Sequence, residues 1–384
     1  MRKIIFRYIF KEITMAFFMI LFVLTFVLLM GRILQIMDLM VNKGVSFYSI
    51  AKLITFLLPS FMTLTIPVAL LIAILITMGK FSADNEITAL KASGVSLMQI
   101  FYPVALASLI TFVFTILISN FLMPKSNFAT MKLLFEIATQ NASVGIKEKV
   151  FNADFKDLLL YADRISTDGH YMEGVLISDK RIIDEPNTIL AKRAFLVSNP
   201  DLMLVKMRLE NGSIHTVNKD FKNYRKIDFE RYDINLDLSS NIISLGEEHK
   251  RSKDLTIDEL LKKMKNPSID KTTLREMAIE LHKKFSIPLS CIFFGLLALP
   301  LGIRSHRAVK SRGFAMGIIL ATLYYLLRIG GEALAETGYL SPEIGVWMPN
   351  VIFAVLGIYL FIIAYKEISP LHLVKVFLWQ KINH

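Results

Sequence analysis

The sequence lacks most of the features that catalysis and cofactor binding require. One cysteine, Cys291, occurs among 384 residues, which excludes an intrachain disulfide and a cysteine-based metal site. The seven histidines are scattered, and none lies at the i, i+4 spacing of helical metal ligands. No G-x-x-x-x-G-K-[ST], H-E-x-x-H or G-x-S-x-G motif is present. We therefore expect no catalytic residue, no metal and no cofactor in this chain, and no ATP hydrolysis of its own.

The net charge is +11, but this positive excess is not spread over the whole chain. The central block Lys125–Asp270 holds 23 basic and 23 acidic residues and is neutral. The remainder holds 21 basic and 10 acidic residues and carries the whole excess. This distribution argues against nucleic-acid binding, because the cations gather beside the most apolar parts of the chain.

Apolar residues make up 54% of the chain, and the mean hydropathy of +0.50 is typical of an integral membrane protein. A membrane-spanning helix needs roughly 20 apolar residues to cross about 30 Å of hydrocarbon. Six stretches meet this requirement: Ile13–Met37, Leu53–Gly79, Leu97–Met123, Phe285–Ile303, Phe314–Ala335 and Gly345–Tyr365.

The flanking charges predict the orientation of these spans. Cations cluster in four alternate segments, Met1–Glu12, Lys80–Ser96, Arg304–Gly313 and Lys366–His384. The two short loops on the other side carry only Lys43 and Lys52. Because cytoplasmic loops are enriched in Lys and Arg, both termini are expected in the cytoplasm and the central block outside it.

The central block has the pattern of a β domain. Runs rich in strand-forming residues occur at Asp157–Ile165, Met172–Ser178, Thr188–Val197, Met203–Val217 and Lys226–Leu238. Asn211-Gly212 is a hairpin signal inside the fourth run. Helical spacing returns at Thr256–Lys265, and a continuous helix is expected from Asp270 into the fourth span.

The expected fold class is therefore an α-helical membrane protein with six transmembrane helices, three before and three after an inserted all-β, jelly-roll-like domain. The expected domains are residues 1–123 with spans one to three, residues 124–270 with the β domain, and residues 271–384 with spans four to six and the C-terminal tail.

A short polar stretch, "SADNEITALKASGVSL", separates the second and third spans and predicts a helix over about residues 82–94. Ser82 or Asp84 is the expected cap, Glu86 falls in the first turn, and Gly94 is the expected stop. One interpretation is a plain interfacial helix that Glu86 stabilises. The other is a coupling helix that docks on a separate ATPase.

Several segments of this chain resemble the LptF/LptG permeases of lipopolysaccharide export, and the LptF branch more closely. They are "IIFRYIFKE" at Ile4–Glu12, "GKFSADNEITALKASGVS" at Gly79–Ser96, "FKNYRKIDFERYDINLDL" at Phe221–Leu238 and "ALPLGI" at Ala298–Ile303. Each motif alone is weak, but their order and spacing cover the whole chain.

The resemblance implies a permease subunit of an ABC transporter in the inner membrane of a Gram-negative bacterium, with its β domain in the periplasm. The implied partners are an LptG-like permease, two copies of an LptB-like ATPase that hydrolyses the ATP, and LptC-like and LptA-like periplasmic β proteins. The implied cargo is lipopolysaccharide, which is extracted from the membrane and passed to a bridge toward the outer membrane.

The resemblance also implies roles for single residues. Glu86 matches the glutamate of the coupling helix, and Asp84, Ile87 and Leu90 are its expected companions at the ATPase. Arg32, in "GRILQI" at Gly31–Ile36, resembles an arginine near the charged head of the lipid, although Leu29 stands where the family has a lysine.

Arg328 and Glu332 stand at i, i+4 in the fifth span. A simple ion pair explains them, and Arg328 is the second candidate for a headgroup contact.

Two alternative functions remain open on the sequence alone. The chain could be a similar permease that pairs with itself or moves another lipid. It could also be a membrane-anchored assembly or sensor protein whose outer β domain binds a ligand.

Overall fold

The computed structural model describes residues 2–43, 45–145, 148–155, 158–166, 171–179, 187–199, 204–217, 224–236, 252–266, 269–303 and 310–366. The chain divides into two compact units. The membrane unit contains Met1–Ile36, Ile54–Asn127 and Ser252–His384, and the sheet unit contains Met37–Leu53 and Phe128–Arg251. The chain thus leaves the membrane unit after Ile36 and again after Asn127, and it returns at Ile54 and at Ser252.

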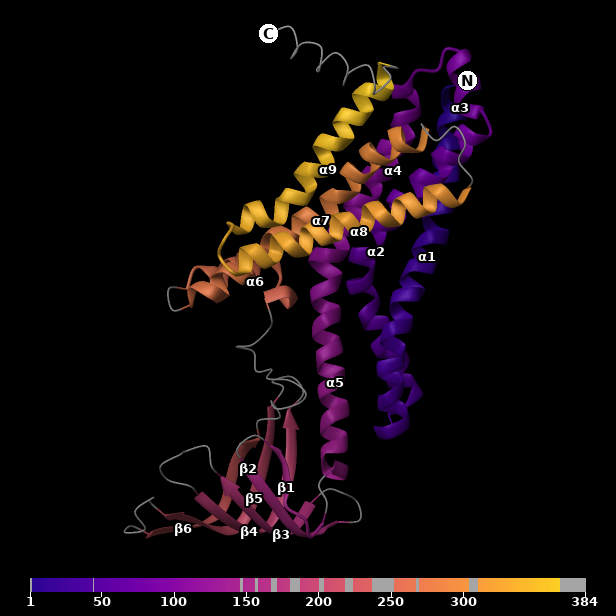
Figure 1. The fold of residues 1–384 in the computed structure, drawn as a ribbon. Helices are drawn as coiled ribbons and strands as arrows, with labels where there is room; N and C mark the ends of the chain where they lie inside the picture. The colour runs from indigo at the N-terminus through magenta and orange to yellow at the C-terminus, as the bar shows by residue number, and fades with distance from the viewer. Residues whose placement is uncertain are drawn as a thin grey trace. The chain divides into compact units, whose positions relative to one another are not determined.

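The helices follow the apolar pattern of the sequence (Figure 1). They are α1 (Arg2–Lys43), α2 (Phe47–Ala83), α3 (Glu86–Ala92), α4 (Leu97–Leu117), α5 (Met123–Gly145), α6 (Ile257–Met264), α7 (Lys271–Ile303), α8 (Lys310–Glu336) and α9 (Pro342–Tyr365). A π-helical turn, Ile118–Leu122, joins α4 to α5.

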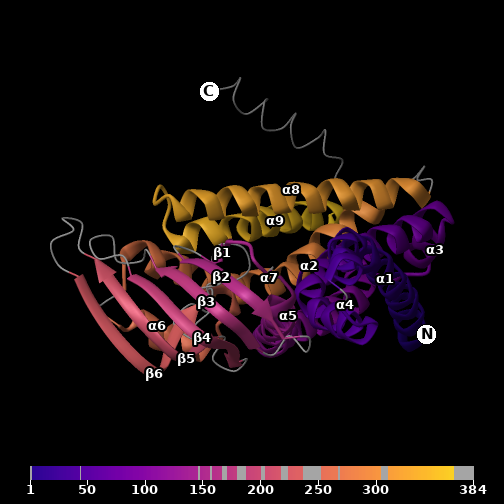
Figure 2. The ribbon, with the colours of Figure 1, turned by 90° about the horizontal axis from the view of Figure 1, so that it is seen from below.

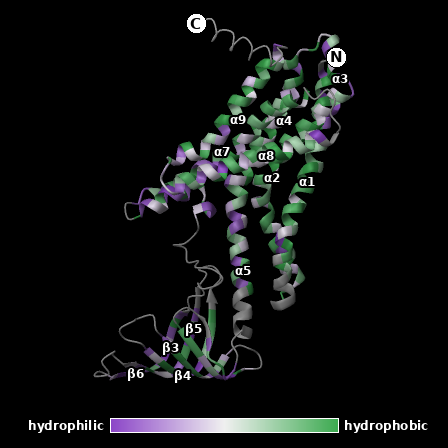
Figure 3. Ribbon diagram, viewed as in Figure 1, coloured by the Kyte–Doolittle hydropathy of each residue, from purple (hydrophilic) through white to green (hydrophobic). Residues whose placement is uncertain are grey.

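Six of the described helices are long and apolar enough to cross a membrane, which confirms the expected number of spans. Hydrophobic residues dominate α1, α2, α4 and α9 along most of their length (Figure 3). The continuous helix into the fourth span is confirmed as α7, and the expected helix at Thr256–Lys265 is confirmed as α6. The loop 304–309 and the tail 367–384, where the sequence places further cations, lie outside the described residues.

Helix α2 forms the centre of the membrane unit. Its residues from Ala69 to Leu75 are almost completely buried. Helix α1 reaches it through Thr25 and Thr65, whose hydroxyl oxygens lie 3.1 Å apart. Helix α8 reaches it through Tyr325, whose hydroxyl donates to the carbonyl of Leu64 at 2.9 Å. Because α2 contacts helices from both halves of the chain, its position is fixed along most of its length.

The structure contains a helix, α5, that the sequence analysis did not predict. The segment from Met123 to Gly145 forms a helix where the sequence analysis began the strand-rich block. Phe135 of α5 packs into the apolar core of the sheet unit, together with residues such as Leu160 and Val175. The mixed composition of α5 hid it, because polar residues interrupt its apolar ones at short intervals, whereas α4 is apolar almost throughout.

The sheet unit contains six antiparallel strands paired in sequence order, as Figure 2 shows. They are β1 (Asn152–Phe155), β2 (Leu158–Ile165), β3 (Tyr171–Asp179), β4 (Asn187–Asn199), β5 (Leu204–Val217) and β6 (Tyr224–Leu236). The inserted β domain is confirmed, but the jelly roll is not the arrangement of the described strands. A jelly roll needs two sheets with crossovers, whereas these strands form one meander.

The predicted hairpin at Asn211-Gly212 is wrong, because both residues lie inside β5. Asn211 does adopt the left-handed conformation that the signal requires, with φ of 54°. The strand nevertheless continues past it, because both halves of β5 stay paired with β4 and β6. Asn211 therefore produces a kink instead of a turn.

This kink belongs to a row of residues that crosses the sheet, which we name the fold line. It contains one residue from each of the strands β2 to β6: Asp163, Gly174, Lys192, Asn211 and Glu230. The pairing register skips these residues in all four strand pairs. The buried positions change parity there, from Met172 to Val175 in β3 and from Ala191 to Ala194 in β4. On the two sides of the fold line, different sets of alternate residues in each strand thus face the same apolar core.

Candidate functional site

The helix between the second and third spans is present as α3, but its start differs from the prediction. It begins at Glu86, and the residue before it, Asn85, has a left-handed φ of 58° and makes no side-chain cap. Ser82 and Asp84 are therefore not its caps. The Ser82 hydroxyl donates instead to the carbonyl of Ile303, at 2.8 Å, and ties the end of α2 to the end of α7.

The end of α3 agrees with the prediction that Gly94 stops the helix. Gly94 has φ of 80°, and its N–H donates to Lys91 O at 2.9 Å. The N–H of Val95 donates to Leu90 O at 3.0 Å, which completes a Schellman motif. On the same helix, Ile87 is only 4% exposed and packs into the core of the membrane unit. Helix α3 is therefore anchored at its end and along one face.

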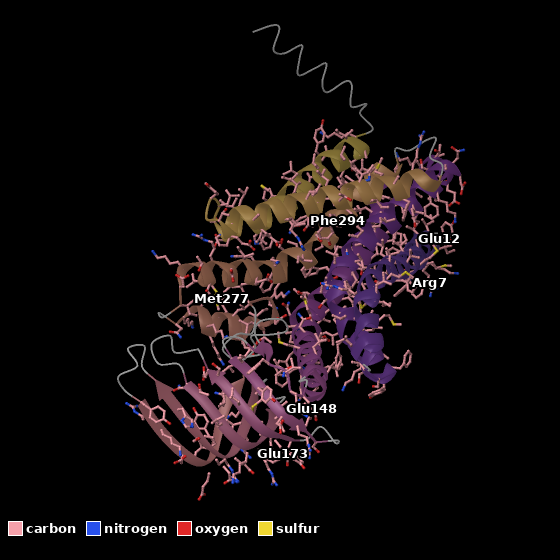
Figure 4. All side chains as sticks on the ribbon, turned by 60° about the horizontal axis from the view of Figure 1, so that its bottom comes forward. Arg7, Glu12, Glu148, Glu173, Met277 and Phe294 are labelled. Atoms are coloured by element: carbon pink, nitrogen blue, oxygen red, sulfur yellow. The ribbon has the colours of Figure 1, made fainter. Side chains whose placement is uncertain are left out.

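Glu86 lies in the first turn of α3, as predicted, and contacts the first span. The Tyr8 hydroxyl of α1 donates to Glu86 Oε1 at 3.3 Å, and the Tyr8 ring stacks on Phe81 with centroids 5.2 Å apart. Beside this contact, Lys80 Nζ lies 3.0 Å from Glu12 Oε2. Figure 4 labels Glu12 and Arg7, both of which belong to α1. Sequence reasoning missed the role of Tyr8, although it stands in the quoted "IIFRYIFKE" segment.

The remaining predicted residues of α3 are more accessible. Asp84 is exposed in the turn before the helix, and Leu90 is half-buried on the helix itself. The arrangement therefore presents an acidic start, formed by Asp84 and Glu86, on a helix whose other face is fixed by Ile87. Such a surface can dock against a cationic groove, and a displacement of α3 can then be passed to α1 and α2.

Charged side chains of α7 and α8 form an ion cluster in the membrane unit. Lys283 Nζ lies 2.7 Å from Glu280 Oε1 and 3.2 Å from Glu332 Oε2. Arg328 Nε lies 3.2 Å from Glu332 Oε1, which confirms the predicted ion pair. Two cations and two anions compensate each other, as burial in an apolar environment requires. The sequence analysis missed Glu280 and Lys283, which form an i, i+3 pair within α7. The contact from Lys283 to Glu332 joins two helices, and spacing within one helix cannot reveal it.

The geometry around Arg328 leaves part of its donor capacity unused. Its Nε and the facing Glu332 Oε1 are buried and make no hydrogen bond among the described residues, so their contact is electrostatic only. The guanidinium lies 4.9 Å from the centroid of the Tyr325 ring. Arg32, the other predicted headgroup ligand, is exposed on α1.

The sheet unit has an open cleft of about 640 Å³ beside the fold line. Apolar residues from three neighbouring strands line it, namely Tyr161, Leu176 and Leu190, which are directly paired in a row. Lys192 of the fold line stands at the same cleft. Asp228 of β6 also lines the cleft, which therefore combines an apolar row with one cation and one anion.

Six candidate spans, an inserted antiparallel sheet and an anchored acidic helix between the second and third spans define a class of protein. This class is the multi-pass membrane permease with an inserted β domain. The chain belongs to the LptF/LptG family of lipopolysaccharide export system permeases, whose sequence model matches residues 7–363.

Individual relatives agree with the family assignment. The chain is 22% identical to the lipopolysaccharide export system permease protein LptF of Escherichia coli K12, over 93% of this chain and 94% of that protein. It is 26% identical to an uncharacterised protein of Rickettsia prowazekii, RP871, over 79% of this chain and 83% of that protein. The chain is thus a lipopolysaccharide export permease of the inner membrane, with a transport role.

Proposed function

We propose that this chain is the permease subunit of an ABC transporter that extracts lipopolysaccharide from the inner membrane and passes it to a periplasmic bridge. The observation that carries the proposal is α3, a short helix with an acidic start that is anchored to the spans beside it. A separate ATPase supplies the energy, since a helix of this kind suits docking and the chain has no phosphate loop.

The family relationship supports a defined set of partners. We propose an LptG-like permease as the second half of the transporter and two LptB-like ATPase subunits on the cytoplasmic side. LptC-like and LptA-like β proteins would receive the lipid on the periplasmic side. ATP is then bound and hydrolysed by the ATPase subunits, and Glu86 and Asp84 meet cations of one of them.

Two arginines are proposed to contact the phosphates of the lipid head. Arg32 is exposed on α1, where a guanidinium can pair bidentately with a phosphate. Arg328 would exchange its contact with Glu332 for a phosphate, and Glu332 would keep Lys283 as its partner. The neutral ion cluster thus offers a cation without leaving a buried carboxylate uncompensated.

The sheet unit is proposed to guide the lipid after extraction. The cleft beside the fold line combines apolar residues with Lys192, as an acyl chain next to a phosphate requires. The edge of the sheet would add strands to the next β protein through main-chain hydrogen bonds. In this proposal both chain termini are cytoplasmic and the sheet unit is periplasmic.

The test of the coupling proposal is co-purification of the ATPase with variants of Glu86. We expect Glu86→Lys to release the ATPase, because like charges would meet at the docking groove. We expect Glu86→Gln to weaken binding about tenfold, in keeping with the loss of one charged hydrogen bond. Lys91→Gln, at the opposite end of α3, is the matched control.

Two results would contradict this proposal. Either the wild-type chain binds no ATPase, or ATPase binding and hydrolysis are the same in the wild type and both Glu86 variants. Glu86 would then only stabilise the helix, and a membrane-anchored assembly or sensor protein would be the better description.

The headgroup proposal is tested by crosslinking at Arg32. A photo-crosslinking residue in place of Arg32 should capture purified lipopolysaccharide in reconstituted vesicles. Arg32→Ala should lower ATP-driven lipid release, whereas Arg32→Lys should retain part of it because the charge remains. Equal lipid release from the wild type and both variants would contradict a phosphate contact.

A further inference from the structure

The chain crosses between its two units four times, and the third and fourth crossings, which we call the two crossings, are held together inside the membrane unit. The chain leaves this unit after Asn127 and returns to it at Ser252. Asn127 Nδ2 donates to Asp254 Oδ1 at 2.7 Å, two residues after the return. A single side-chain hydrogen bond therefore joins the outgoing and the returning crossing.

A second hydrogen bond connects this pair to α2. The Ser60 hydroxyl of α2 donates to Asn127 Oδ1 at 2.7 Å. The three side chains form a directed series in which Ser60 donates to Asn127 and Asn127 donates to Asp254. Both polar atoms of the Asn127 amide are used, so no other residue type except glutamine offers the same donor and acceptor pair.

The series is built into the interior. Asp254 is 6% exposed, and Lys284 of α7, which is 5% exposed, interacts electrostatically with it. Directly after Asp254, Leu255 and Leu260 pack against Met277 of α7. The returning crossing is thus fixed on α7 by apolar packing and on α2 by hydrogen bonds. A buried carboxylate keeps its charge only with such compensation.

Ser60 lies on the helix that leads to α3, so movement of α3 can reach the hydrogen-bonded series of Ser60, Asn127 and Asp254. The same helix ends at Ala83, directly before α3, and Ser60 lies about 35 Å from that end at about 1.5 Å per residue. Pro59, the residue before Ser60, and Pro67, between Ser60 and α3, each remove a main-chain hydrogen bond, so α2 can bend at both turns. A displacement of α3 therefore reaches Ser60 along one continuous helix whose middle is tightly packed.

We propose that Ser60, Asn127 and Asp254 form a clasp that joins both chain crossings to α2, so that movement of α2 is delivered to both crossings together. This inference rests on the proposed function, because the movement comes from the ATPase at α3. The three are positioning residues. Without the clasp, the ATPase would still turn over, but the movement of α2 would no longer be delivered to the two crossings together.

The experiment compares five proteins in reconstituted vesicles with the ATPase and the second permease. They are the wild type, Ser60→Ala, Asn127→Ala, Asn127→Asp, and the exchange Asn127→Asp with Asp254→Asn. Lipopolysaccharide transferred to a soluble acceptor and ATP hydrolysed are measured together. Hydrogen exchange of the full chain in lipid nanodiscs then reports the two crossings, residues 123–131 and 252–256.

For the clasp we expect Asn127→Ala to keep hydrolysis within about twofold and to lower lipid transferred per ATP by about tenfold or more, the effect of one hydrogen bond to a charged group. Asn127→Asp should lower lipid transferred per ATP further, since it places a second carboxylate against that of Asp254. The exchanged pair should recover, because the new carboxylate still accepts from Ser60 and the new amide donates to that carboxylate. Ser126→Ala, which truncates a buried neighbour of Asn127, is the matched control.

The outcomes separate the clasp from the proposed function. If the wild type transfers lipid and the variants transfer equally well per ATP, the clasp is wrong. If hydrolysis, assembly and transfer fall together, the residues only stabilise the fold, which also overturns the clasp. If the wild type transfers no lipid, the proposed function is wrong, and hydrogen exchange decides the clasp. Faster exchange at both crossings in Asn127→Ala supports the clasp, and unchanged exchange contradicts it.

Discussion

At the scale of single residues, Glu86, the proposed coupling carboxylate, already accepts a hydrogen bond from Tyr8 within the chain. Tyr8 holds one carboxylate oxygen from α1, and the second remains available to a cation. Because a carboxylate accepts several hydrogen bonds, the tyrosine and a partner cation can share it. Tyr8 thus orients Glu86 and links α3 to the first span as well as to the second.

The role of Tyr8 can be tested by removing only its hydroxyl. Tyr8→Phe keeps the stacking on Phe81 and should weaken ATPase binding about twofold to fivefold, the effect of one modest hydrogen bond. In a double-mutant cycle, Tyr8→Phe should add nothing to Glu86→Ala, which removes the acceptor of the Tyr8 hydroxyl. The measurement is an ATPase binding titration, with Tyr102→Phe on α4 as the control. Fully additive effects would show that Tyr8 acts independently of Glu86.

At the scale of the elements, close packing between α8 and α9 depends on a pair of glycines. A Cβ atom on Gly331 would lie 2.2 Å from the carbonyl oxygen of Gly345, and the reverse substitution meets the same obstacle at 2.5 Å. Neighbouring helices in membranes approach closely at small residues.

The adjacent Gly330 provides a matched control for this contact, because a Cβ atom there meets nothing within 4 Å. Gly331→Ala should lower the stability of the purified chain by about 1–3 kcal/mol through overpacking. Gly330→Ala should leave stability nearly unchanged or raise it slightly, because Gly is a poor helix former. Thermal unfolding in detergent measures both. Equal melting temperatures would show that α8 and α9 can separate without loss.

The fold line of the sheet makes a second prediction at this scale. Asn211 holds a left-handed conformation with φ of 54°, which β-branched residues avoid. Asn211→Val should destabilise the sheet unit by about 1–2 kcal/mol, whereas Asn211→Gly should be tolerated. Hydrogen exchange at β4 and β5 in the full chain is the measurement. Protection in the valine variant equal to that of the wild type would mean that the kink is not required.

At the scale of the whole molecule, the flanking charges predict the orientation of the chain in the membrane, and labelling can test this prediction. The native Cys291 is fully buried, so the wild-type chain serves as an unlabelled background. In spheroplasts, Lys226→Cys on β6 should react with a membrane-impermeant maleimide. Ser93→Cys, at the end of α3, should react only after permeabilisation. The opposite pattern would reverse the orientation.

The sequence alone determined the features that depend on local composition. Hydropathy located six spans, flanking charge predicted their direction, and the alternation of strand formers located five of the six strands. Gly94 was placed correctly at the end of α3 and Glu86 in its first turn, because these features depend on neighbouring residues, whereas the caps predicted at Ser82 or Asp84 were wrong. Each of these features depends on residues that are neighbours in the sequence, so it can be assigned without knowing the tertiary structure.

Only the tertiary structure decided which distant side chains meet. Ser60 and Asn127 are separated by 67 residues, Asn127 and Asp254 by 127, and Lys283 reaches Glu332 from another helix. The fold line is a similar case, since Gly174 and Asn211 become one feature only when the strands pair. Such contacts depend on packing and register between segments, and no local pattern carries that information. The physical reason is that partition into the membrane is a property of each segment, whereas a hydrogen bond requires two segments to be in place.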